Sequence, residues 1–211
     1  MPRCQFDGRR AELTRNLLTV YSQAINADIT AGLTWYPSAV SGVHAWASVF
    51  ALPPATVACV IAAISPQCNW ADNLRIALAL LQGRLVGNGG GALMTNIGKA
   101  ERVLTDRATD LAPYFKSGPK VTSFARNLQG IGTAVTVDTH AAQAALGDVR
   151  STVSLKQTPY DIFADCYRDA ALQTNLRPCD FQAIVWHIWK RQYPRTRKIG
   201  MRRQWDAIGE F

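Results

Sequence analysis

The sequence predicts an all-α protein, and three observations lead to this class. Apolar residues recur at helical spacing through most of the 211 residues, no stretch keeps the alternating pattern of a strand, and proline, glycine and small polar residues stand where helices would begin and end. With 48% apolar and 18% charged residues, the chain has the composition of a folded globular protein. We therefore expect roughly ten helices in a single domain over residues 1–211.

The first half of the chain predicts four helices separated by proline or glycine, and they span residues 9–27, 39–50, 54–64 and 70–83. Gly32 and Pro37 place a loop between the first two helices. Pro66 separates the last two, because a proline disfavours helix at the residue before it. Trp35 and Tyr36 are then loop residues, which would either stack on a base or pack against a neighbouring helix.

The second half predicts helices over residues 95–105, 122–128, 138–147 and 178–193, with a further helix starting at 158. Another short helix is expected to end near Phe115. Thr158 is expected to cap the helix that follows it, with Pro159 in the first position. Residues 87–91, GNGGG, form a connection that lacks the strand and helix context of a phosphate-binding glycine loop.

The formal net charge of +8 suits a polyanionic partner but does not establish one. Seven Lys or Arg and no acid fall within residues 190–203, so this segment is either a solvated tail or an arm that contacts phosphates. No apolar run reaches the length of a bilayer span, and the first residues lack the apolar region of a signal peptide. We therefore expect a cytoplasmic monomer without membrane contact.

The five cysteines contain no C-x-x-C pair, and the three histidines are scattered along the chain. This arrangement predicts neither a disulfide framework nor a set of metal ligands. No cofactor is expected.

Residues 117–140, SGPKVTSFARNLQGIGTAVTVDTH, place one lysine and one aspartate at the starts of two successive predicted helices. Gly118 lets the backbone approach a partner closely, and the amides of the helix that begins near Lys120 could hold a phosphate. Taken alone, Lys120 is a surface lysine or a phosphate contact, and Asp138 is a helix N-cap. The two side chains together, eighteen residues apart, suggest a site instead.

The segment over residues 116–146 resembles the helix-hairpin-helix signature of the endonuclease III superfamily of DNA glycosylases. The family pattern is a glycine hairpin, a lysine, an apolar helix and then V-D-T-H, and this chain supplies Gly118, Lys120, "FARNLQG" and "VDTH". Upstream, "ACVIAAISPQCNW" resembles the family's buried helix that ends in S-x-Q, and "NIGKAERVL" resembles its N-x-K-A-E helix. The matches cover residues 55–147.

This resemblance implies a fold of two helical lobes with the site in the cleft between them. One lobe would comprise residues 54–137, and the other residues 1–50 with 139–193, followed by a basic tail over 190–211. The partner would be duplex DNA with an extruded base. Lys120 and Asp138 would be catalytic, and the resemblance assigns DNA binding to Gln67, Lys116, Ser117, Gly118 and His140.

The resemblance also implies a role for each of these side chains. Asp138 would stabilise positive charge on the sugar as the glycosidic bond breaks, and Lys120 would attack the anomeric carbon to form a Schiff base. Gln67 would fill the gap left by the extruded nucleotide. His140 would contact a phosphate, hydrogen-bond the Asp138 carboxylate or cap the helix.

The chain departs from the family pattern at its hairpin. Lys116 stands where the first hairpin glycine usually lies, Pro119 follows the second, and the segment between Lys99 and Lys120 is short. No four-cysteine motif for an iron-sulfur cluster follows Asp138. Three functions stay open: a DNA glycosylase with or without lyase activity, a phage-type DNA base-hypermodification transferase on the same scaffold, and a DNA-binding module without chemistry.

Overall fold

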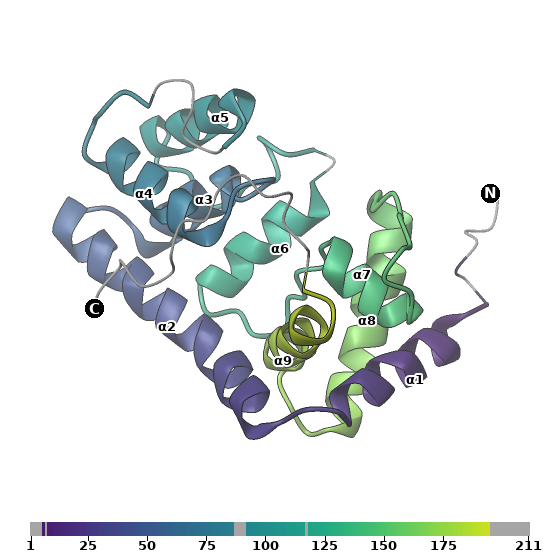
Figure 1. Ribbon diagram of the computed structural model, residues 1–211. Coiled ribbons are helices and arrows are strands. Elements are labelled where there is room, and N and C mark those ends of the chain that lie inside the picture. The colour runs from purple at the N-terminus through teal and green to yellow at the C-terminus, as the bar shows by residue number, and fades with distance from the viewer. Residues whose placement is uncertain (1–5, 7, 87–91, 117, 195–211) are drawn as a thin grey trace.

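The computed structural model describes residues 6, 8–86, 92–116 and 118–194. All regular structure in these residues is helical, which confirms the predicted all-α class (Figure 1). The helices are α1 (Arg10–Tyr21), α2 (Asn26–Phe50), α3 (Pro54–Ile64), α4 (Trp70–Leu81), α5 (Met94–Thr105), α6 (Pro119–Leu128), α7 (Thr139–Leu146), α8 (Gln157–Gln173) and α9 (Pro178–Gln192).

Several predicted helix boundaries are confirmed, and their local causes are visible. α3 and α9 each begin with a proline in the first position, where the missing N–H has no partner to lose. The Asn69 side chain caps α4 by accepting the backbone N–H of Asp72 at 2.9 Å. α7 ends at Gly147, whose φ of 65° is the left-handed conformation that glycine adopts readily.

The predicted loop around Gly32 and Pro37 is wrong, because α2 runs through both residues. A Cβ on Gly32 would lie 2.4 Å from Ile184 Cγ1 and 2.6 Å from the Ile184 backbone nitrogen, so this glycine permits close packing of α2 on α9. Pro37 leaves the carbonyl of Leu33 without its helical donor, and both residues are exposed, so water can reach that carbonyl. The first predicted helix correspondingly divides between α1 and α2.

Three other boundaries also differ from the predictions. The short helix expected before Phe115 is only a turn. α6 begins at Pro119, which agrees with the helix start predicted near Lys120 and precedes the start predicted at Thr122. α8 begins at Gln157 after Lys156, so Thr158 lies inside the first turn and is not the cap. Pro159 still falls among the first residues of α8, whose N–H groups have no intrahelical acceptor.

The apolar side chains form two clusters. The first contains α3, α4, α5 and α6 with the second half of α2, and the second contains α1, α7, α8 and most of α9. Figure 1 shows α3, α4 and α5 gathered at one end of the molecule and α1, α7 and α8 at the other, with α6 and α9 between them. The division into glycosylase-like lobes stays a prediction.

α3 lies at the centre of the first cluster, since residues 56–64 are each at most 2% exposed. Within the described part of the chain, no single helix is long and apolar enough to cross a membrane. α2 and α3 meet that criterion only as a pair, and the chain bends by 116° between them.

Candidate functional site

The hairpin before α6 is a tight turn built on Phe115. The Gly118 N–H donates to the Phe115 carbonyl at 3.0 Å, and a Cβ on Gly118 would lie only 3.1 Å from the Phe115 Cβ. Glycine therefore suits this position because of close packing rather than because of a left-handed φ. Lys116 is exposed, Lys120 is half-buried in the first turn of α6, and Ser117 lies outside the described residues.

A third lysine lies at the same hairpin. The Nζ of Lys99 on α5 is 4.1 Å from the centroid of the Phe115 ring, a cation–π contact that links α5 to the turn. Lys99 thus contacts the turn through Phe115, and Lys116 and Lys120 flank it in the sequence. Such a concentration of positive charge beside helix-start amides suits a phosphate.

The Asp138 carboxylate is held at both oxygens. Its Oδ1 accepts the backbone N–H of Ala141 at 2.8 Å, which makes Asp138 the N-cap of α7, as local sequence indicated. Its Oδ2 accepts the indole N–H of Trp186 on α9 at 3.2 Å. The side chain is half-buried, so two donors from different helices orient a carboxylate that still reaches solvent.

The segment that leads into Asp138 is equally constrained. The Tyr160 hydroxyl donates to the Val135 carbonyl at 2.7 Å and accepts the Val137 N–H at 3.2 Å. Burial raises the pKa of Tyr160, and burial with a smaller contribution from the Asp138 charge raises that of Tyr167. Both phenols are therefore neutral neighbours of Asp138 rather than acids or bases near neutral pH.

A buried polar network ties this segment to α6. The Tyr36 hydroxyl lies 3.2 Å from Thr136 Oγ1 and 3.3 Å from Gln182 Oε1, and the Asn127 amide donates to Thr136 Oγ1 at 3.2 Å. All four side chains are at most 8% exposed. Because α2, α6 and α9 all contribute, the network fixes the segment before Asp138 against the helix that carries Lys120.

Lys120 and Asp138 are related in the structure through the residues between them rather than by a contact of their own. Among the described residues no ion pair joins them, since the polar partners of the Asp138 side chain are Ala141 and Trp186. The Ser123 side chain, one turn along α6 from Lys120, lies beside Tyr160, and Tyr160 feels the charge of Asp138. The starts of α6 and α7 are thus linked through the buried side chain of Tyr160.

Gln67 adopts a strained backbone conformation. Cys68 N–H donates to the Ser65 carbonyl at 3.2 Å, and Pro66 and Gln67 occupy the middle of the turn that this bond closes. Gln67 has a φ of 60° and is exposed. A left-handed conformation costs a residue with a Cβ about 1 kcal/mol. Ala51, Arg107 and Asn175 also adopt it, each within two residues of a helix end.

Three aromatic side chains connect the turn at Gln67 to α6. The Trp35 ring centroid lies 5.3 Å from that of Trp70 and 5.9 Å from that of Phe124, and the Trp70 and Phe124 centroids are 6.2 Å apart. Phe124 is one turn along α6 from Lys120. Trp35 belongs to α2 rather than to a loop, and it packs against this neighbouring helix group. The turn that presents Gln67 is therefore positioned relative to the helix that carries Lys120.

Trp186 is a site residue that sequence reasoning missed. Besides its bond to Asp138, its ring lies 6.3 Å from the half-buried His140 ring, nearly perpendicular, and 4.7 Å from the Lys190 ammonium. The available signal was that Trp186 falls outside the inward-facing stripe of α9, which is formed by its neighbours.

Among the described residues, the remaining His and Cys side chains offer no second catalytic group. Burial lowers the pKa of His187, and His44 is exposed. Burial raises the pKa of the Cys59 and Cys179 thiols to about 12, which leaves them protonated and unreactive. No group of His, Cys, Asp or Glu that could hold a metal occurs in the part of the chain that the structure describes.

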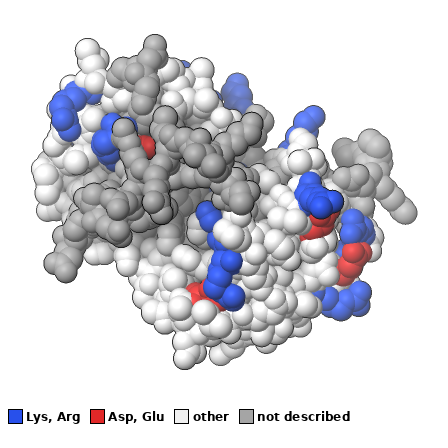
Figure 2. Space-filling model, in the orientation of Figure 1, with Lys and Arg blue, Asp and Glu red and all other residues white. Residues whose placement is uncertain are grey.

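The basic segment over residues 190–203 divides into two parts. Arg191 lies on α9, donates to Asp28 Oδ2 at 2.8 Å and to the Gln23 carbonyl at 3.0 Å, and lowers the pKa of the nearly buried Asp28. Arg191 is therefore a structural residue. Residues 195–203 lie outside the described residues. Figure 2 shows Lys and Arg side chains in several separate groups on one face, some beside acidic side chains.

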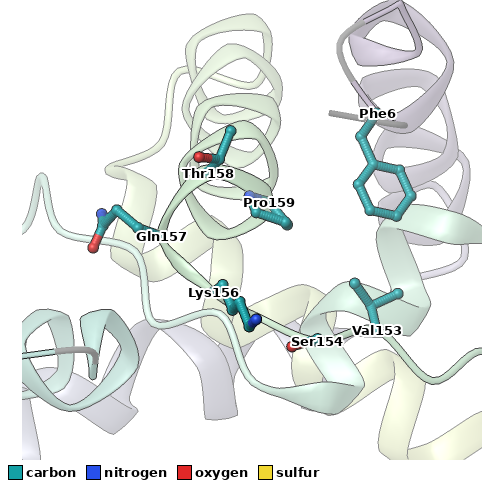
Figure 3. A pocket seen from close by; sticks show the side chains of 7 residues that line it. All are labelled: Phe6, Val153, Ser154, Lys156, Gln157, Thr158 and Pro159. Atoms are coloured by element: carbon teal, nitrogen blue, oxygen red, sulfur yellow. The ribbon is translucent and has the colours of Figure 1, made fainter. Parts of the chain in front are cut away.

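An open pocket of about 590 Å³ lies between Phe6 and the start of α8 (Figure 3). It is lined by Phe6, Val153, Ser154, Lys156, Gln157, Thr158 and Pro159. None of the predicted site residues lines it.

A family model matches residues 2–193, nearly the whole described chain, and this family is the family of unknown function DUF7178. The chain belongs to DUF7178. No curated protein and no solved structure matches it. The matched part of this DUF7178 protein includes every candidate site residue named above.

Proposed function

We propose that this DUF7178 protein binds duplex DNA, extrudes one nucleotide and cleaves the glycosidic bond of its base. The single observation that carries the proposal is the anchoring of the half-buried Asp138 carboxylate by one backbone and one indole N–H. A carboxylate oriented by donors from two helices is suited to stabilise positive charge that develops on a sugar. The resemblance of the surrounding sequence to helix-hairpin-helix glycosylases supplies the reaction class.

The hairpin would hold the DNA backbone. Lys99 contacts the turn through Phe115, Lys116 and Lys120 flank Gly118 in the sequence, and lysines so grouped contribute sequence-independent affinity for phosphates. Gln67, exposed on its strained turn, would occupy the gap in the stack after the nucleotide leaves it.

The chemistry would proceed at the anomeric carbon. In the lyase form, the Lys120 amine adds to this carbon as the bond to the base breaks. The base leaves with the bonding electrons and takes up a proton, and the lysine nitrogen loses one. The C1′–O4′ bond of the sugar then breaks and its oxygen takes up a proton, which opens the ring and leaves a protonated Schiff base between Lys120 and the anomeric carbon. In the simple glycosylase form, water adds instead, and Asp138 stabilises the cationic sugar in both cases.

A second candidate function is transfer of a group to a modified base on the same scaffold. The observation that favours it is the altered hairpin, in which exposed Lys116 and helix-starting Pro119 replace the usual pattern. In that reaction Lys120 would bind phosphate rather than attack the sugar.

The proposal is tested with duplex oligonucleotides that carry a panel of damaged or hypermodified bases, incubated with the protein and then treated with borohydride. A covalent complex that forms with the wild type and is lost in Lys120→Ala supports the lyase. Base release without trapping, lost in Asp138→Asn, supports a simple glycosylase. Lys156→Ala, which removes an exposed lysine at the start of α8, serves as the charge-matched control. DNA binding without base release or trapping across the panel would refute the proposal.

A further inference from the structure

Trp186 makes two different polar contacts through one side chain. Its indole N–H, which can only donate, points to Oδ2 of Asp138 at 3.2 Å. The Lys190 ammonium lies over its ring, 4.7 Å from the centroid, where the negative face of an indole attracts a cation. A carboxylate and an ammonium are therefore both placed by the same ring.

A second tryptophan on α9, Trp189, makes neither of these contacts, so they are specific to the position of Trp186. Trp189 is 2% exposed, belongs to the second apolar cluster, and its Nε1 is buried with no hydrogen-bond partner in the structure. Trp189 thus contributes apolar packing alone. Trp186 is half-buried and lies where its N–H and ring face can both be used.

Lys190 is half-buried, and among the described residues its ammonium contacts the Trp186 ring and forms no ion pair with Asp138. A nucleotide whose sugar faces Asp138 brings its own phosphates close to that carboxylate, and the like charges repel. A cation held beside the carboxylate offsets this repulsion. Because Lys190 covers the ring face of Trp186, that face is not an open platform for a stacked base.

We infer that Trp186 is a positioning residue, which orients Asp138 toward the sugar and holds Lys190 against a phosphate of the same nucleotide. This inference rests on the proposed function for the role of Asp138, whereas its phosphate contact requires only DNA binding. Lys190 would then contact the DNA backbone, as proposed for Lys99, Lys116 and Lys120 at the hairpin. Unlike those three lysines, it follows Asp138 in the sequence.

The phosphate contact is tested by the salt dependence of binding to duplex DNA. Replacing a lysine that contacts one phosphate lowers the magnitude of the slope of log K against log salt by about 0.9. We expect this change in Lys190→Ala and an unchanged slope in Lys156→Ala. We also expect the slope to change in Trp186→Ala but not in Trp186→Phe, which keeps a ring for the ammonium. A wild-type slope in Lys190→Ala would overturn the contact.

The orienting role is tested with Trp186→Phe, because it removes the N–H and keeps an aromatic ring. With a base that the wild type releases, kcat should fall by roughly tenfold or more while KM stays unchanged, since a hydrogen bond to a charged group is lost. Trp189→Phe should leave both constants unchanged. Equal kcat in Trp186→Phe and the wild type would overturn the orienting role.

A spectroscopic measurement separates this inference from the proposed function. In a ¹H–¹⁵N spectrum, Asp138→Ala should shift the indole N–H resonance that Trp186→Phe removes, and should leave that of Trp189 in place. If that shift and the altered salt slope occur but no base is released, the proposed function fails and the positioning role stands. If base release occurs and neither change is found, only the positioning role fails. A protein that does not bind DNA refutes both.

Discussion

The indole N–H of Trp186 lies 3.2 Å from the Oδ2 of Asp138, which joins two residues 48 positions apart in the chain. The other carboxylate oxygen accepts the Ala141 N–H, so Asp138 has a capping partner on its own helix and an orienting partner on α9. This geometry allows the structural and the proposed catalytic role of one carboxylate to be separated by substitution.

Asp138→Asn and Asp138→Ala are expected to differ in stability and to agree in activity. Asparagine caps a helix about as well as aspartate, but its one acceptor oxygen cannot also accept the Trp186 N–H. Both variants therefore lose that bond, and Asp138→Ala should lose about 1 kcal/mol more because it also loses the cap. Both lack the negative charge that the proposed reaction requires. Urea unfolding and base-release assays measure the two effects. A fully active Asp138→Asn protein would refute a catalytic role for the carboxylate.

Local sequence signals predicted the boundaries that depend on local chemistry. Pro54 and Pro178 mark helix starts and Gly147 marks a helix end because each residue acts on the backbone of its own turn. Gly32 misled the prediction because its reason is a contact with Ile184 on another helix. A glycine that permits close packing cannot be distinguished from a turn glycine without knowing its neighbour.

The same distinction applies to the candidate site. Asp138 was predictable as the start of α7 from the run of β-branched residues before it and the helical pattern after it. Trp186 was not, because its bond to Asp138 depends on how α9 packs across α7. The strain at Gln67 was also invisible, since no local rule predicts a left-handed glutamine after Pro66.

Gln67→Gly is expected to stabilise the protein while impairing its proposed function. Glycine removes the left-handed strain at φ 60°, and after its larger entropy loss on folding the net gain is about 0.5 kcal/mol. Gln67→Ala keeps the strain and also lacks the amide. Both variants should retain the extruded nucleotide less well, as measured with a fluorescent base analogue. Equal unfolding free energies for the two variants would argue against strain at this turn.

Gly32→Ala and Gly42→Ala, both on α2, should change stability in opposite directions. A Cβ at Gly32 would meet the Ile184 backbone nitrogen at 2.6 Å, so α2 and α9 must separate. We therefore expect the free energy of unfolding to fall by about 1–3 kcal/mol, the cost of overpacking a core. A Cβ at Gly42 meets nothing within 4 Å, so alanine should add up to about 1 kcal/mol through helix propensity. Thermal unfolding tests the pair, and an unaffected Gly32→Ala protein would contradict close α2–α9 packing.

Protonation of His187 is expected to reduce the free energy of unfolding as the pH falls. Burial lowers its pKa in the folded state, while the nearby Asp28 charge opposes this shift and Lys190 adds to it. The unfolded state therefore takes up the proton first, so the stability from neutral His187 is present above the unfolded pKa of about 6.5 and is lost as the pH falls through the lower folded value. His187→Leu should flatten the unfolding free energy over this window, and because Nε2 has no hydrogen-bond partner in the structure, no bond at that atom is lost. The exposed His44 provides the control: His44→Gln should keep the wild-type pH dependence. An unchanged pH dependence in His187→Leu would show that this histidine is equally easy to protonate in the folded and unfolded protein.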